Sequence, residues 1–326
     1  VINAGDSFYP AGVAVDSPEW ESYWGDVYHG LPPDTPWYSV YGNHDYGQFN
    51  RICACSPEDL QGRHCAQVQK HGYRTKKSRQ RWHLPSVNYY KEIALPGMWK
   101  GASFEIVALD LNYLDSHVQC TWIGCTATRC DGKDGHPHDG DNELGCKMEK
   151  CQETMHNRGV EAIKLLWARV QKAEKTGTQL IVVSHYPTDY LKNTGFKVGN
   201  TWLHFDQILS RPSVRLVYFG AHRHTTDNKT VMPIGRNPTW VVGGGGGWSC
   251  DGNTLGIENQ GVVVGEIQTD GGVANLRVLN VPKSKCCFPN PRHYDDHGHP
   301  VTYLRDAHLV HNPFEKHGKG DTKHGR

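Results

Sequence analysis

The feature that most constrains this chain is the polar segment 42–45, Gly-Asn-His-Asp, which directly follows the apolar run 37–41. Three other segments have the same form, a short apolar run that ends in Asp or His: residues 1–9, 180–187 and 214–224. α/β proteins place their chemistry in loops at the carboxyl ends of strands. One such segment could be an ordinary polar turn, because Gly, Asn and Asp all favour turns. Four in one chain indicate a shared site.

The side chains at these strand ends are oxygen and imidazole donors, without a thiolate among them. They include Asp6, Asn43, His185, His222 and His224. Such donors suit hard or borderline metals such as iron, manganese and zinc. The sequence therefore predicts a metal site that is assembled from several strand ends.

The ordered motifs G-D-x-x-Y, G-N-H-D, x-H-Y-P and x-x-H-x-H resemble those of the calcineurin-like metallophosphoesterases. Tyr9, three residues after Asp6, narrows the resemblance to the purple acid phosphatases. Segment 81–86, which leads into Tyr89 and Tyr90, is similar to the small, tartrate-resistant type. The resemblance covers roughly residues 1–280. It implies an α/β fold, a four-layer α/β/β/α sandwich of two mixed sheets flanked by helices, and we expect this fold to be N-terminally truncated because the chain opens inside a predicted strand.

The resemblance also implies a binuclear metal centre. Asp6 would bridge two metals, and Tyr9 and His224 would hold the first, an Fe(III) that favours a phenolate ligand. The second metal, Fe(II), Zn or Mn, would be held by Asn43, His185 and His222. His44 would bind the phosphate and assist the leaving group. Tyr190 is the nearest candidate for a further substrate contact.

The implied function is hydrolysis of small phosphate monoesters at acid pH by a metal-bound hydroxide. One alternative is a related phosphodiesterase or nucleotide hydrolase with two like metals, against which Tyr9 argues. Another is a secreted, non-catalytic relative, because the first metal-binding Asp of the family is absent from this chain. The last motif also departs from the family pattern: Ala221 replaces Gly, and Arg223 replaces Asp.

Composition bounds the compartment and the partners. A net charge of +1 gives no global field that would attract nucleic acid. No apolar run approaches the ~20 residues of a membrane-spanning helix. We therefore expect no nucleic-acid partner and no membrane span. The resemblance implies small phosphomonoester substrates, and the sequence leaves the oligomeric state open, with a monomer favoured.

Eleven cysteines indicate an oxidising compartment. Several are separated by four residues rather than by the two typical of zinc ribbons, which favours disulfides over a zinc site. Asn228 begins a glycosylation sequon. These features predict a secreted, extracellular protein or one of a lysosome-like or vacuolar compartment.

One domain is expected over residues 1–282, with cysteine-bearing insertions at about 50–86 and 112–156. We expect the basic run 70–81 to be a solvated, mobile loop, and the cluster from His136 to Asp141 to be a loop rather than a metal site. Helical spacing predicts a helix from an N-cap at Asn157 to Gly177. The polar, His-rich segment 283–326 is predicted to be a disordered tail.

Overall fold

The computed structural model describes residues 1–8, 12–47, 55, 59–77, 79–97, 101–123, 148–224, 226–228, 231–243, 260–281 and 308–310. Tyr9 lies outside this set. So do the cluster from His136 to Asp141 and all of the predicted tail except His308–Val310.

Six strands form the central sheet, in the order β10-β11-β9-β6-β5-β4. Their bounds are β4 Tyr89–Ala94, β5 Ser103–Leu109, β6 Gln179–Ser184, β9 Leu216–Gly220, β10 Thr226–Asp227 and β11 Thr239–Val242. β5, β6, β9 and β11 run parallel, while β4 and β10 are antiparallel edges. The parallel strands therefore end at one edge, where His185 follows β6 and His222 follows β9.

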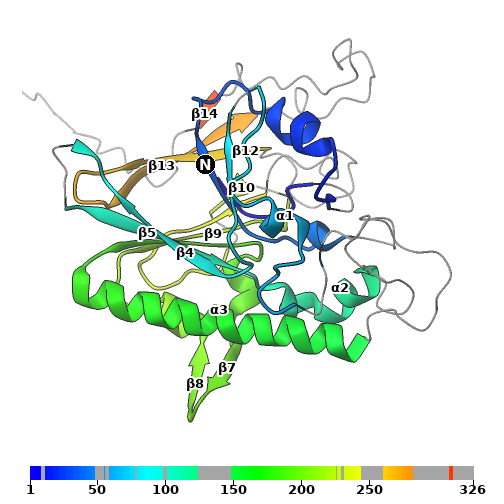
Figure 1. Ribbon diagram of the computed structural model, residues 1–326. Coiled ribbons are helices and arrows are strands. Elements are labelled where there is room, and N and C mark those ends of the chain that lie inside the picture. Colours follow the sequence, from blue (N-terminus) through cyan, green and yellow to red (C-terminus); the bar gives the residue numbers. More distant parts are fainter. Residues whose placement is uncertain are drawn as a thin grey trace, which may run out of the picture.

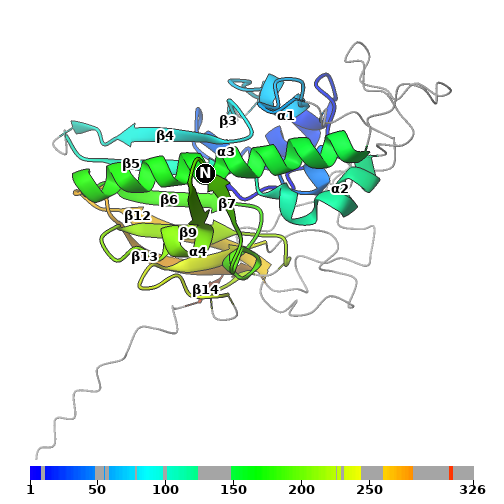
Figure 2. The ribbon, with the colours of Figure 1, turned by 90° about the horizontal axis from the view of Figure 1, so that it is seen from below.

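Alternate side chains of this sheet enter two separate cores. Ile106, Ile181 and Val217 face one core, and their neighbours Val107, Val182 and Leu216 face the other. Helix α3, Met148–Thr176, covers the second face, and helix α4, Phe205–Leu209, packs in the same core (Figure 1; Figure 2). Burial on both faces explains why these strands read as continuous apolar runs.

The opposite face of the sheet is covered by two smaller sheets. β1 Ile2–Asn3, β2 Pro36–Ser39 and β3 Arg81–His83 form a parallel sheet. β12 Gln260–Ile267, β13 Val273–Val281 and β14 His308–Val310 form an antiparallel one, and β12 and β13 lie on the side of the molecule away from α3 (Figure 1). The predicted α/β fold is confirmed, with several sheets flanked by helices.

A cluster of aromatic side chains fills the core between these layers. Trp20 and Trp24 belong to the π-helix η1, Trp20–Gly25, and both pack edge-on against the buried Trp82. Trp82 lies in β3, next to the basic run 70–81. The mobility expected of this run stays a prediction. Its charged side chains are exposed except that of Lys70, which is half-buried, whereas Thr75 and Gln80 are buried.

The described parts of the second insertion are helical. Its first part forms η4 Asn112–Asp115 and α2 Ser116–Ile123, and its last part belongs to α3. Helix α3 begins at Met148, well before the predicted N-cap at Asn157. The early turns are held by a disulfide between Cys120 and Cys151 and by burial of Met155, so Cys and Met complete the apolar stripe there. The end at Gly177 is confirmed: its φ is 70° and its N–H donates to the Ala173 carbonyl at 2.8 Å.

The remaining elements connect these layers. η2 His44–Tyr46 follows β2, α1 Ala66–Gln69 precedes β3, and η5 Thr188–Leu191 follows β6. β7 Gly195–Val198 and β8 Thr201–His204 form a hairpin that projects past α3 (Figure 1).

Candidate functional site

Four of the predicted ligands converge on one point. Asp6 follows β1, Asn43 follows β2, His185 follows β6 and His222 follows β9. Nε2 of His185 lies 2.8 Å from Oδ1 of Asn43 and 3.4 Å from Oδ2 of Asp6. Nδ1 of His222 lies 3.2 Å from both Oδ1 of Asn43 and Nε2 of His185. The site therefore joins the end of the small parallel sheet to the end of the central sheet.

These separations fit a metal-binding donor set. Ligands placed ~2.1 Å from a tetrahedral metal lie about 3.4 Å from one another. The four separations given above are 2.8–3.4 Å, at or somewhat below that value. Within the described residues, His, Cys, Asp and Glu alone form no group of three that could hold a metal. The site therefore depends on the amide oxygen of Asn43, which contacts both histidines.

Each histidine has its second ring nitrogen directed at an oxygen. Nδ1 of His185 lies 2.9 Å from the Ala4 carbonyl, which accepts a hydrogen bond from an Nδ1–H. When the ring is neutral and its proton is on Nδ1, Nε2 is left to bind a metal. Nε2 of His222 points toward Oδ2 of Asp115 at 3.8 Å, a distance that a water can bridge. Such outer partners orient metal-ligating histidines and fix their tautomers.

Burial favours the uncharged forms of His222 and His224. Burial, together with the neighbouring His185, lowers the pKa of His222 to about 4, although the carboxylate of Asp6 acts in the opposite direction. Burial also lowers the pKa of His224, while the carboxylate of Asp6 acts in the opposite direction. Neutral imidazoles at moderately acid pH are free to accept a cation.

Backbone geometry brings these side chains close together. Asp6, His222 and His224 have φ values of 55°, 63° and 55°, in the left-handed region that non-glycine residues seldom adopt. Gly42 passes so close to Asp6 that a Cβ atom there would lie 2.1 Å from its Oδ1. Backbone strain of this kind persists where the surroundings hold it, and it concentrates at functional sites.

Asp45, the last residue of the Gly-Asn-His-Asp segment, holds the ligand loops together. Its Oδ1 accepts from the Ser7 N–H at 2.8 Å and from Nε2 of Gln67 at 2.7 Å, and its Oδ2 accepts from the Gly42 N–H at 2.9 Å. Burial and the nearby charge of Asp6 raise its pKa to about 7. The sequence did not assign this anchoring role, because two of the partners, Ser7 and Gln67, lie far along the chain.

The remaining residues predicted for the site are not among the four converging donors. The backbone N–H of His44 donates to Oδ1 of Asp6 at 3.0 Å, and its side chain is buried. Tyr190 is partly exposed and lies edge-on to His222, with ring centroids 5.5 Å apart. Tyr9 lies outside the described residues.

A buried polar network underlies the site. Arg158, on α3, pairs with Asp110 at 3.5 Å and donates to the hydroxyl of Tyr46 at 2.5 Å. Asn112 links Asp110 to the Tyr41 carbonyl and accepts from the Tyr186 hydroxyl. This agrees with a structural role for Asp110.

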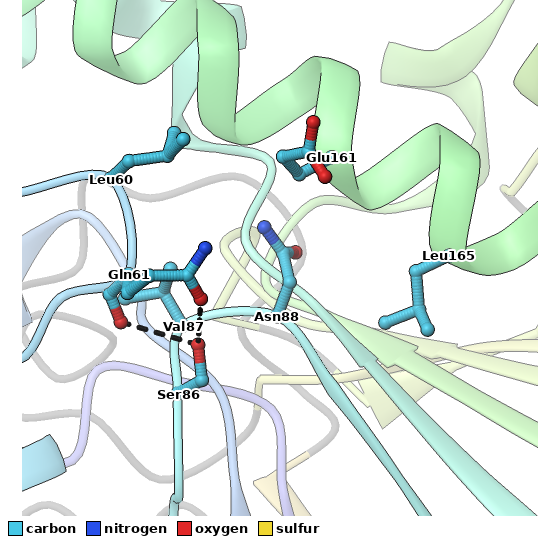
Figure 3. A pocket seen from close by; sticks show the side chains of 7 residues that line it. All are labelled: Leu60, Gln61, Ser86, Val87, Asn88, Glu161 and Leu165. Atoms are coloured by element: carbon cyan, nitrogen blue, oxygen red, sulfur yellow. Dashed lines mark hydrogen bonds between the residues drawn. The ribbon is translucent and has the colours of Figure 1, made fainter.

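A small pocket elsewhere on the surface contains none of the candidate residues. It lies between α3 and the start of β4, where Ser86 donates to Gln61 (Figure 3). Its lining is Leu60, Gln61, Ser86, Val87, Asn88, Glu161 and Leu165. The candidate site is thus defined by converging ligands rather than by this pocket.

The fold and the site together define an α/β protein with oxygen and imidazole donors gathered at its strand ends. The family model of calcineurin-like phosphoesterases matches residues 1–226 of the 326. The chain belongs to the calcineurin-like phosphoesterase family. Phosphoester hydrolysis is the general chemistry of this family, whose members typically bind divalent metals.

No curated protein matches the chain. Among solved structures, it is similar to GAP50, the anchor in the inner membrane complex of Plasmodium. The identity is 17%, the TM-score is 0.47, and the match covers 89% of this chain and 76% of that one.

Two disulfides lie among the described residues, Cys55–Cys65 and Cys120–Cys151, and both are compatible with an extracellular location. No helix of the described part has both the length and the apolar character needed to cross a membrane.

Proposed function

We propose that this chain is an acid phosphatase of the purple type, which hydrolyses phosphate monoesters at a binuclear metal centre. The observation that supports it best is the convergence of Asp6, Asn43, His185 and His222 with donor atoms 2.8–3.4 Å apart. They are the bridging carboxylate and the three further ligands expected for the second metal.

The residues present would hold two ions. Asn43, His185 and His222 would bind Fe(II), Zn or Mn, and Tyr9 and His224 would bind Fe(III), with Asp6 between the two. When bound, such a pair supplies the nucleophile and stabilises both the attacking and the leaving oxygen.

The side chains and backbone groups of the site would orient the metal ligands and protonate the leaving group. The Ala4 carbonyl fixes the ring of His185, and burial keeps His222 neutral. His44 is tied through its N–H to the carboxylate of Asp6. From there its side chain would bind the phosphate and give a proton to the leaving oxygen, while Tyr190 would contact the substrate at the partly exposed edge of His222.

The location and partners belong to the same proposal. Disulfides at Cys55–Cys65 and Cys120–Cys151 and a glycan on Asn228 would suit a secreted or vacuolar protein. The substrates would be small phosphomonoesters and the protein a monomer, with no nucleic-acid partner.

The test uses the full chain, loaded with iron, and measures both visible absorption and hydrolysis of an aryl phosphate monoester and a diester. A phenolate on Fe(III) gives a violet to pink colour, which Tyr9→Phe should bleach while the matched Tyr190→Phe keeps it. Asn43→Ala should weaken the second metal. His44→Ala should keep both metals and slow turnover by roughly 10²–10⁴-fold.

Two results would replace the proposal. A colourless, iron-loaded protein that hydrolyses only diesters would be a phosphodiesterase. A protein that binds metal and hydrolyses neither ester would be the non-catalytic relative.

A further inference from the structure

His222 lies at the centre of an unusual three-residue turn. Its φ is 63°, and the N–H of Arg223 donates to the carbonyl of Ala221 at 2.7 Å. A γ-turn with positive φ at its centre is rare and strained. Such a conformation is unfavourable in itself and persists only when its surroundings hold it in place. Some contacts must therefore hold this turn.

Neighbouring groups contact the ring of His222 and the first residue of the turn, Ala221. The ring centroids of Tyr186 and His185 lie 4.8 and 5.0 Å from that of His222. The N–H of Ala221 donates to the His185 carbonyl at 2.7 Å. These contacts join the turn to the loop after β6.

An ion pair acts on the exit from the turn. Arg223 pairs with Asp189, in η5 of the loop after β6, and each side chain is 28% exposed. Oδ1 of Asp189 is buried and has no hydrogen-bond partner among the described residues. Because a partly buried carboxylate left without its cation is costly, Arg223 and Asp189 should depend on each other.

We infer that the Arg223–Asp189 ion pair is a clamp that keeps the His222 turn closed, so that Nδ1 of His222 stays beside Asn43 and His185. The inference rests on the proposed metal site. Arg223 stands between the two histidines where the family pattern has Asp. The clamp makes it a positioning residue, which acts through His222.

The experiment is a double-mutant cycle on the full chain: Arg223→Ala, Asp189→Ala and the two together. Zn²⁺ affinity is measured by calorimetry, and hydrogen exchange is measured on peptides that cover residues 220–224. Loss of a partner that orients a metal ligand typically costs 10–100-fold in metal affinity. We expect each single variant to lose that much and the double variant to lose no more than about threefold beyond the weaker single one. The backbone amide at position 223 should exchange faster in all three variants than in the unaltered chain.

The matched control is Arg215→Ala, which breaks an ion pair with Asp270 just before β9, where the side chains are 46% and 61% exposed. It should change neither readout. Arg223→Lys, which keeps the charge, should retain most of the affinity and serves if Arg223→Ala does not fold.

The clamp would be overturned if Arg223→Ala kept the native Zn²⁺ affinity and the native rate of amide hydrogen exchange. It would also be overturned if the losses of Zn²⁺ affinity in the two single variants added up fully in the double variant. If the unaltered chain binds no Zn²⁺, the proposed metal site fails and the exchange of the Arg223 amide alone decides on the clamp. If zinc binding shows the coupling but no ester is hydrolysed, the proposed function fails and the clamp stands.

Discussion

The close approach of Gly42 to Asp6 makes Gly42→Ala the most informative single substitution. A Cβ atom at Gly42 would lie 2.1 Å from Oδ1 of Asp6 and 2.4 Å from its backbone nitrogen. Ordinary contact begins at 3.4 Å, so the carboxylate oxygen would have to retreat by 1.3 Å, the difference between 3.4 and 2.1 Å. The backbone nitrogen cannot move away as a flexible side-chain end could.

The consequence follows from this displacement. Overpacking of a tight site costs typically about 1–3 kcal/mol, which a domain with about 5–15 kcal/mol of stability survives. A misplacement of about 1 Å near the reacting groups can cost roughly 10²-fold in rate. We therefore expect Gly42→Ala to fold, to bind Zn²⁺ at least about tenfold more weakly, and to lose about 10²-fold in turnover of a monoester.

The assay compares Gly42→Ala with Gly30→Ala, because a Cβ atom at Gly30 meets nothing within 4 Å. Thermal unfolding and zinc calorimetry are run on both. The control should match the unaltered protein in metal affinity. If Gly42→Ala binds zinc with native affinity, the carboxylate of Asp6 is not held by this contact and the assignment of Asp6 as a ligand loses its geometric basis.

Three further predictions concern stability. Burial, with the charges of His71, Lys91 and Arg81, lowers the pKa of His83 to about 4. Between pH 6.5 and 4 the unfolded state therefore binds one proton more than the folded state, and the unfolding free energy should fall as the pH falls. After a discount for the partial exposure of the ring, His83→Phe should reduce the stability lost between pH 7 and 4.5 by about 1 kcal/mol in urea titrations. If the variant loses as much stability over this range as the unaltered protein, the lowered pKa is contradicted. Arg158→Ala should lower the unfolding free energy by about 3–5 kcal/mol, because it leaves Asp110 buried without its cation. The control Lys164→Ala breaks an exposed ion pair with Glu161 and should lower it by less than about 1 kcal/mol. Equal losses in the two variants would show that the buried network does not stabilise the fold. Removing the disulfide with Cys120→Ser and Cys151→Ser should lower the unfolding free energy by about 2–5 kcal/mol, and ready alkylation of both thiols in the native, unreduced protein would show that the bond is not formed.

The sequence by itself determined the layered fold and the strand ends that carry the ligands. The apolar runs before His185 and His222 could be read directly, because the parallel strands β6 and β9 are buried along their whole length and are continuously apolar. The runs before Asp6 and Asn43 are shorter, but each is also followed at once by a polar ligand. The end of α3 at Gly177 could also be predicted from local sequence, because glycine readily adopts the positive φ that terminates a helix.

Only the tertiary structure decided how those ligands are held. Asp45 binds backbone groups of Ser7, and Asp115 approaches His222 across more than one hundred residues, so no local pattern reveals either contact. The start of α3 was missed because a disulfide and a buried Met replace the usual aliphatic spacing. Local propensity acts over a few residues, whereas burial, charge pairing and the orientation of a histidine depend on which distant segments the fold brings together.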